Sequence, residues 1–159
     1  MKKAMLMILL SLVISLVHCG GGGNISLVKK GLLDFDKSKT VGEAFDNYKY
    51  FKGLKWDSFK SEDERDIVEV IAEYNIEKAL KAMEAMELEN IKAVRRGFDK
   101  IKKVIVTFQF RINKDNTFEV HWYGAKYYGK NGKKVEKNLS SESDITNVLE
   151  GIYDNEPDI

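Results

Sequence analysis

The sequence predicts one α+β domain, with an antiparallel meander sheet of about four to five strands and helices packed on one face. Apolar and polar residues alternate over several segments of strand length, whereas other segments carry apolar residues at helical spacing. Turn sequences such as Asn131-Gly132 separate the alternating segments, as in antiparallel hairpins. The chain is long enough for one domain with a buried core.

Residues 1–18 have the build of a secretory signal peptide. Lys2 and Lys3 precede an apolar stretch from Ala4 to Val17. This stretch is shorter than the roughly 20 apolar residues that a membrane-spanning helix needs. A cleaved leader is therefore favoured over a permanent transmembrane anchor.

Cys19, the one cysteine of the sequence, ends this leader in a pattern that resembles the lipobox of bacterial lipoproteins. Leu16, Cys19 and Gly20 match the lipobox, whereas His18 stands where a small residue is usual. The resemblance implies cleavage before Cys19, a diacylglyceryl group on its sulfur and a fatty acid such as palmitate on the new amine. The protein would then be anchored to the cell membrane or the outer membrane of the cell envelope, with its domain outside the cytoplasm. The alternative is an ordinary secretory signal.

Four glycines follow Cys19, and glycine-rich segments are flexible. We expect residues 19–24 to form a tether between the lipid and a domain that covers residues 25–159. Without the leader, 24 basic side chains stand against 25 acidic ones, which argues against a nucleic-acid partner. Once Cys19 carries lipid, no thiol remains for a disulfide, a metal site or a nucleophile.

The first half of the domain is predicted to contain a helix and a hairpin. Ile25 to Phe35 is either a strand or a docked extended arm. Thr40 and Glu43 have the spacing of a capping box, which predicts a helix start there. Two strands, Leu54 to Lys60 and Ile67 to Tyr74, follow. The inward residues are predicted to be Val41, Ala44, Phe45 and Tyr48 in the helix and Val68, Val70, Ala72 and Tyr74 in the second strand.

Asn75 is predicted to cap a helix that runs from Ile76 towards Glu89. Met83 and Met86 lie on its apolar stripe and are expected to fill the core rather than to bind a ligand. The apolar register changes near Asn90, which predicts a second short helix, or a bent continuation, ending near Gly97.

The second half of the domain is predicted to contain most of the sheet. Lys103 to Asn113 has the clearest strand pattern, Thr117 to Tyr128 returns antiparallel to it, and Lys133 to Leu139 adds a weaker strand. A last helix begins at Ser141 or Ser143 and is expected to lie beside the first. Pro157 prevents its continuation, and the acidic tail is expected to be frayed. The inward residues are predicted to be Val104, Val106, Phe108, Phe110 and Ile112, then Phe118, Val120 and Trp122, then Ile145, Val148, Leu149 and Ile152.

No motif of a known catalytic, metal or nucleotide site is present in the sequence. We therefore predict a protein that is not an enzyme, with no catalytic residues, no metal and no cofactor. His121 is the one imidazole left after cleavage and lies mid-strand, on the parity opposite Trp122. The alternative is an envelope hydrolase in which folding brings carboxylates to His121.

Two groups of residues are candidates for a binding surface. Tyr50 and Trp56 belong to an aromatic cluster among lysines, and core packing is the competing explanation for these rings. The second group surrounds the Asn131-Gly132 turn, where lysines also serve to protect a sheet edge from pairing with other chains. Its partners would be an envelope protein, a polysaccharide or anionic head groups. This second group comprises Tyr127, Tyr128, Lys130, Lys133 and Lys134.

The sequence TVGEAFDNY at residues 40–48, followed by Trp56 and Phe59 at W-x-x-F spacing, resembles a family of small bacterial lipoproteins with this pair of motifs. No activity is established for that family, so the resemblance implies an envelope lipoprotein and no catalytic residues. This chain differs by a helical insertion from Ile76 to Ile101. We therefore expect a lipid-anchored, non-enzymatic binding or structural module. A secreted, inhibitor-like protein-binding domain is a further alternative.

Overall fold

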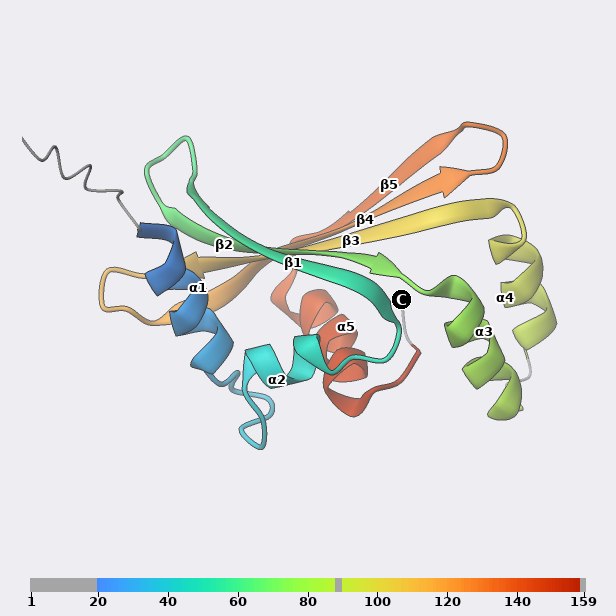
Figure 1. Ribbon diagram of the computed structural model, residues 1–159, viewed down its shortest axis with the longest axis horizontal. Coiled ribbons are helices and arrows are strands. Elements are labelled where there is room, and N and C mark those ends of the chain that lie inside the picture. The colour runs from blue at the N-terminus through green and yellow to red at the C-terminus, as the bar shows by residue number, and fades with distance from the viewer. Residues whose placement is uncertain (1–19, 88–89, 158–159) are drawn as a thin grey trace, which may run out of the picture.

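The computed structural model describes residues 20–87 and 90–157, so the predicted leader and Cys19 lie outside the described residues. A five-stranded antiparallel sheet forms, with its strands side by side in chain order (Figure 1). This confirms the predicted α+β class and the meander. The strands are β1 (Phe51–Lys60), β2 (Asp66–Tyr74), β3 (Ile101–Ile112), β4 (Phe118–Gly129) and β5 (Lys134–Leu139).

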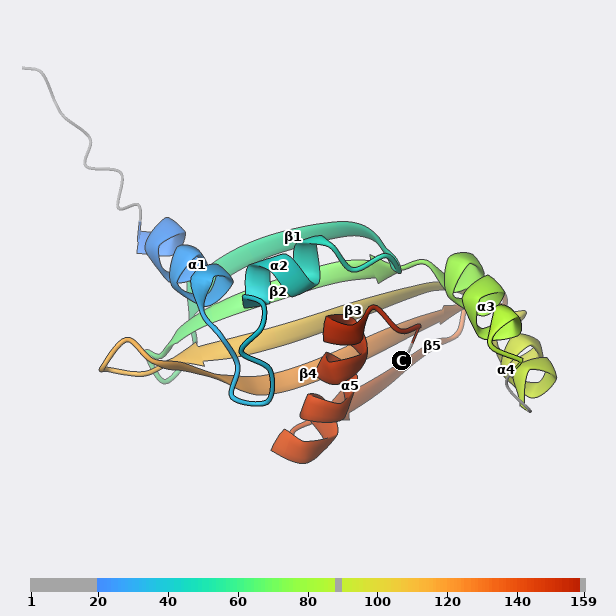
Figure 2. The same ribbon diagram turned by 90° about the horizontal axis from the view of Figure 1, so that it is seen from below.

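The helices lie in two places. Three of them pack on one face of the sheet, whereas α3 and α4 form a hairpin at one end of it (Figures 1 and 2). Among the described residues, no helix covers the opposite face, which we call the uncovered face. The helices are α1 (Gly20–Lys30), α2 (Val41–Asp46), α3 (Ile76–Ala85), α4 (Ile91–Phe98) and α5 (Glu142–Asp154).

The core lies between the sheet and helices α1, α2 and α5. Phe45 of α2 is 1% exposed, and its ring centroid lies 5.1 Å from that of Phe108 on β3. Helices α2 and α5 contact each other, as predicted from their similar stripes. Most of the predicted inward residues are buried here, among them Val68, Val70, Ala72 and Tyr74 on β2, Val104, Val106 and Phe110 on β3, and Ile145, Leu149 and Ile152 on α5.

The predicted helix caps of α2 and α3 both form. The Glu43 backbone N–H donates to the Thr40 hydroxyl at 3.2 Å, and the Thr40 N–H donates to the Glu43 carboxylate at 2.8 Å. The Lys78 N–H donates to the Asn75 side chain at 3.2 Å. These bonds satisfy backbone donors that a helix start leaves without a partner. Helix α4 is separate from α3, which agrees with the predicted second short helix and not with a bent continuation of α3.

The N-terminal segment differs from its prediction. Helix α1 occupies residues 20–30, where an extended glycine tether and then a strand or arm were expected. Val28 is fully buried, and the Lys29 ammonium lies 2.6 Å from the Asp46 carboxylate of α2. Packing against α2 and the sheet thus outweighs the low helix propensity of the glycines.

Trp122 also differs from its prediction, because β4 contains a β-bulge. Phe110 pairs with Val120 but Gln109 pairs with Trp122, so His121 is an extra residue without a partner in the ladder. The bulge reverses the alternation, and Tyr123, rather than Trp122, is buried in the core. Trp122 therefore lies on the uncovered face.

The C-terminal tail is docked as far as Pro157, where fraying was expected. Asn155 ends α5 in the left-handed conformation, with φ 58°, and the Glu156 N–H then donates to the Gly151 carbonyl at 2.8 Å. The Tyr48 hydroxyl donates to the Glu156 carbonyl at 2.8 Å. Pro157 is buried.

Candidate functional site

The two aromatic residues predicted near the first helix do not form a surface. Tyr50 is 6% exposed and packs edge-on against Tyr48 at 5.4 Å between centroids. Trp56 faces the helices, with its ring 5.8 Å from that of Phe45, and its indole N–H donates to Asp46 at 3.2 Å. The prediction of Tyr50 and Trp56 as a binding surface is therefore wrong. Tyr50 is buried in the core and Trp56 packs against it, which was the competing explanation.

The residues predicted around the β4–β5 turn lie at one end of the sheet but on different faces. Tyr127 pairs with Val104 and faces the helices, whereas Tyr128 pairs with Lys103 and faces the uncovered side. Lys130 and Lys133 lie in the turn itself. Lys134 forms an ion pair with Glu136 at 2.6 Å. This group is brought together as predicted, but it spans an edge rather than one flat surface.

His121 is exposed, at the bulge of β4. Within residues 20–87 and 90–157, its imidazole has no hydrogen-bond or ion-pair partner, and no group of three or more His, Cys, Asp or Glu residues is placed to hold a metal ion. The geometry therefore supplies neither the carboxylate nor the hydroxyl that general acid–base chemistry at His121 would require.

The uncovered face of the sheet is the candidate site, and the strand register defines its composition. Side chains that alternate with the core residues point to this face. They lie in rows that run across the strands, and four of these rows follow one another from the β1–β2 turn. The first row is Phe59, Ile67, Arg111 and Glu119, and the second is Asp57, Glu69, Gln109 and Trp122. The third row is Lys55, Ile71, Thr107, Gly124 and Asn138, and the fourth is Gly53, Glu73, Ile105, Lys126 and Glu136.

Trp122 lies across Gly124 on β4, at the end of its row and beside the end of β5. A Cβ atom added to Gly124 would fall 2.2 Å from Cη2 of the indole, so the ring occupies the space that a side chain would need. Next to Trp122 in the register, the Gln109 side-chain amide donates to the Glu69 carboxylate at 2.7 Å. Glycine at position 124 thus permits close contact between the indole and the backbone.

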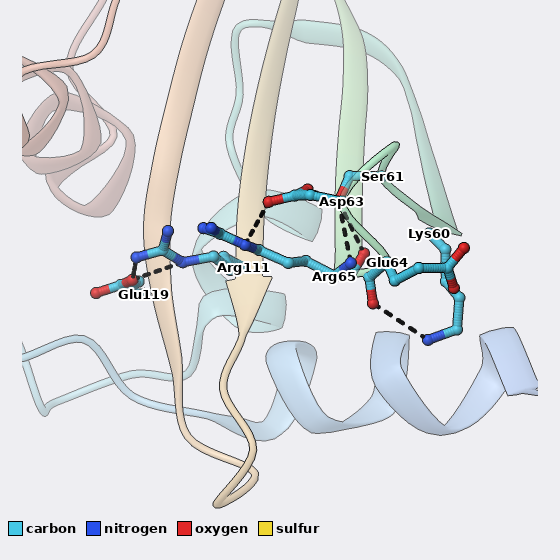
Figure 3. Close-up of polar contacts among 7 residues, drawn as sticks. All are labelled: Lys60, Ser61, Asp63, Glu64, Arg65, Arg111 and Glu119. Atoms are coloured by element: carbon cyan, nitrogen blue, oxygen red, sulfur yellow. Dashed lines mark hydrogen bonds and ion pairs between the residues drawn. The ribbon is translucent and has the colours of Figure 1, made fainter.

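The end of the face beside the β1–β2 turn carries paired charges (Figure 3). Arg111 donates from Nε to Glu119 at 2.8 Å, and Arg65, which extends across β3, pairs with Asp63 at 2.6 Å. The Ser61 hydroxyl donates to Asp63 at 2.6 Å, and this hydrogen bond lowers the pKa of the Asp63 carboxyl. The charges at this end are held in place by one another.

The opposite end of the face is also ion-paired. The Glu73 carboxylate lies 3.1 Å from the Lys103 ammonium and 3.5 Å from that of Lys52. The hydrogen bond from Lys103 lowers the pKa of Glu73. Between the two charged ends, Ile71, Ile105 and Trp122 are half-buried. The middle of the face also contains charges, because the Lys55 ammonium lies 2.7 Å from the Asp57 carboxylate. The uncovered face thus combines three half-buried apolar side chains with charged groups that are paired with one another.

Comparisons of the chain with protein-family models, curated proteins and solved structures give no match. The resemblance to small envelope lipoproteins therefore stays a prediction. In the part of the chain that the structure describes, none of the helices has both the length and the apolar composition to cross a bilayer.

Sequence reasoning missed Trp122 and Gly124 because it extended one alternation through the whole of β4. A signal was present in the sequence. From Tyr123 onwards, the odd-numbered Tyr123, Ala125 and Tyr127 continue an apolar alternation that does not match the even-numbered Phe118 and Val120. Such a change of parity inside one strand is what a bulge produces.

Proposed function

We propose that this protein is a lipid-anchored, non-enzymatic binding module of the cell envelope that presents the uncovered sheet face to a partner protein. The observation that supports this most is Trp122, an aromatic residue seated across Gly124 on that face. Aromatic residues are enriched at the centres of protein interfaces and contribute much of their binding free energy.

The charged ends of the face support the same proposal. Binding is weaker when long side chains must be ordered on association, because that ordering costs conformational entropy. Arg111, Lys103 and Lys52 are already held by Glu119 and Glu73, so less ordering would remain to be done. Paired charges beside the half-buried apolar side chains would also select partners with a complementary charge pattern.

Site-specific photocrosslinking tests the partner surface. A photoreactive phenylalanine derivative at Thr107, next to Gly124 in the register, should crosslink to a discrete envelope protein, and Trp122→Ala should reduce that product. The matched control is Asn147, which is exposed on α5. If both positions give the same products, or if Thr107 gives none, the uncovered face is not the binding surface.

The anchor is tested separately by intact mass and membrane fractionation of the chain expressed in a bacterial host. We expect a mass that starts at Cys19 and includes lipid, together with membrane association, and we expect Cys19→Ser to lose both. Soluble, unlipidated protein from both forms would reduce the localisation to simple secretion.

A further inference from the structure

A groove of about 500 Å³ opens where α3 and α4 meet the adjoining ends of β3 and β4. Its volume lies within the range of about 300–1,000 Å³ that is typical of small-molecule sites. Most of its lining is apolar, and includes Leu80 and Met83 of α3, Val94 and Phe98 of α4, and Ile101 and Tyr127 of the sheet.

The groove exists because α3 and α4 extend beyond the part of the sheet that the other helices cover (Figure 1). Helix α4 buries none of its residues fully. Met83 is half-buried and Met86 is 51% exposed, so the prediction that both fill the core is wrong. Part of the apolar stripes of α3 and α4 is therefore exposed and does not pack against the core.

The segments beside this groove are rich in cations. Residues 91–103 and 126–137 together contain eleven Lys and Arg against two acidic residues, although the whole chain carries a net charge of only +1. Helix α3, which also lines the groove, is balanced, with Lys78 and Lys81 against Glu77 and Glu84, and Glu84 pairs with Arg95. The two segments meet here, where the Lys130 N–H donates to the Lys100 carbonyl at 2.9 Å. Among the described residues, five side chains form no ion pair and no hydrogen bond: those of Arg96, Lys100, Lys102, Lys130 and Lys133.

The cations lie next to residues that line the groove. Lys100 and Lys102 flank Ile101, and Arg96 precedes Gly97, which also lines it. Tyr127 adds a phenol without a hydrogen-bond partner among the described residues. A tyrosine hydroxyl is protonated at neutral pH and can donate, and burial raises the pKa of Tyr127 further above that range.

We propose that this groove binds a long-chain fatty acid, with the acyl chain along the apolar lining and the carboxylate among the surrounding cations. The charge complementarity singles out this class. A neutral lipid would leave the cations unpaired, and a short carboxylate would leave the apolar lining in water. This site lies on the helix-bearing side at one end of the sheet and is separate from the uncovered face.

Fluorescence titration with cis-parinaric acid, a long-chain fatty acid, tests the proposal on the full chain carrying Cys19→Ser, so that no protein-bound lipid contributes. We expect saturable binding that palmitate displaces and that butyrate and hexadecanol do not. Gly97→Phe is the blocking variant, because a Cβ at Gly97 meets no atom within 4 Å and a ring there would enter the groove. It should weaken binding about tenfold or more.

Gly53→Phe is the matched control for the blocking variant, because a Cβ at Gly53 on β1 also has open space around it. For the charges, Lys100→Glu with Lys130→Glu should weaken binding of palmitate about tenfold. Lys49→Glu with Lys114→Glu makes the same change of net charge elsewhere on exposed residues and should have little effect. Far-UV circular dichroism confirms that each variant is folded.

Two outcomes would overturn the proposal. Unchanged parinarate affinity in folded Gly97→Phe would show that the acyl chain does not enter the groove. Absence of parinarate binding, with binding of the same protein to phosphatidylglycerol vesicles that survives Gly97→Phe, would assign the cations to a membrane surface instead.

Discussion

Replacement of Gly124 by alanine would test whether Trp122 lies across the uncovered face. The new Cβ would fall 2.2, 2.7 and 2.9 Å from Cη2, Cζ2 and Cζ3 of the indole. Carbon atoms pack at about 3.5–4.0 Å, so the ring would have to move by roughly 1.5 Å. Trp122 is half-buried, and the uncovered side gives its ring space to move outward.

The expected effect of Gly124→Ala on the free energy of unfolding depends on whether the Trp122 indole is present. In the wild-type background, overpacking against the ring should lower the free energy of unfolding by about 1–2 kcal/mol. In a Trp122→Ala background this ring is gone, and alanine should be more stable than glycine in a strand by about 0.5–1 kcal/mol. The sign of the effect therefore reverses, which corresponds to a coupling of roughly 2 kcal/mol.

Urea unfolding followed by far-UV circular dichroism of the four proteins in this cycle measures the coupling. Gly53→Ala provides the control, because a Cβ at Gly53 meets no atom within 4 Å and should leave the stability nearly unchanged or slightly higher. If Gly124→Ala changes the free energy of unfolding equally in both backgrounds, the indole does not rest on Gly124. The main observation behind the proposed function would then be wrong.

Three further predictions concern the fold and its pH dependence. Phe45→Ala should lower the free energy of unfolding by about 3–5 kcal/mol in the same urea assay, because the ring is 1% exposed and contacts four aromatic rings; a cost below about 1 kcal/mol would contradict the proposed core. Thr40→Ala should lower it by about 1 kcal/mol through loss of the α2 cap, whereas an unchanged value would show that the cap contributes nothing. The hydrogen bond from the Thr40 backbone N–H, and to a lesser extent that from the Thr40 hydroxyl, lowers the pKa of Glu43. The ionised carboxylate therefore stabilises the folded state at pH values above the ordinary pKa of 4.5. This contribution is lost as the pH falls through the lowered pKa. The stability difference between wild type and Glu43→Gln should therefore shrink on acidification below pH 4.5 when urea unfolding is repeated across this range, and a difference that does not depend on pH would exclude the linkage.

Local patterns in the sequence were sufficient to predict most of the fold. The Thr40 and Glu43 pair located the start of α2, and Asn75 located the start of α3. In β2 and β3, strict alternation of apolar residues identified the buried face correctly. Each of these features depends on residues within a few positions of one another, so a single sequence contains the information.

The features that sequence reasoning missed depend on contacts between distant residues. Glycine-rich residues 20–23 are helical because α1 docks on α2 and the sheet, which local propensity does not reveal. For Trp56 the sequence left core packing and a binding surface open, and the contacts with Phe45 and Asp46 decide for core packing. The cations beside the groove come from two segments that lie more than twenty residues apart in the chain and meet at the Lys100–Lys130 hydrogen bond.

The position of the α3–α4 hairpin in the chain makes it a removable module. Strands β2 and β3 are neighbours in the sheet, with Glu73 paired to Ile105. Residues 75–100 therefore form one long connection between adjacent strand ends. Exchange of this connection for a short turn would reduce the entropy cost of closing the loop by roughly 1 kcal/mol, because that cost grows with the logarithm of loop length. The sheet and its uncovered face should then fold without the groove. The proposed partner binding and the proposed fatty-acid binding would thus be separable by one deletion.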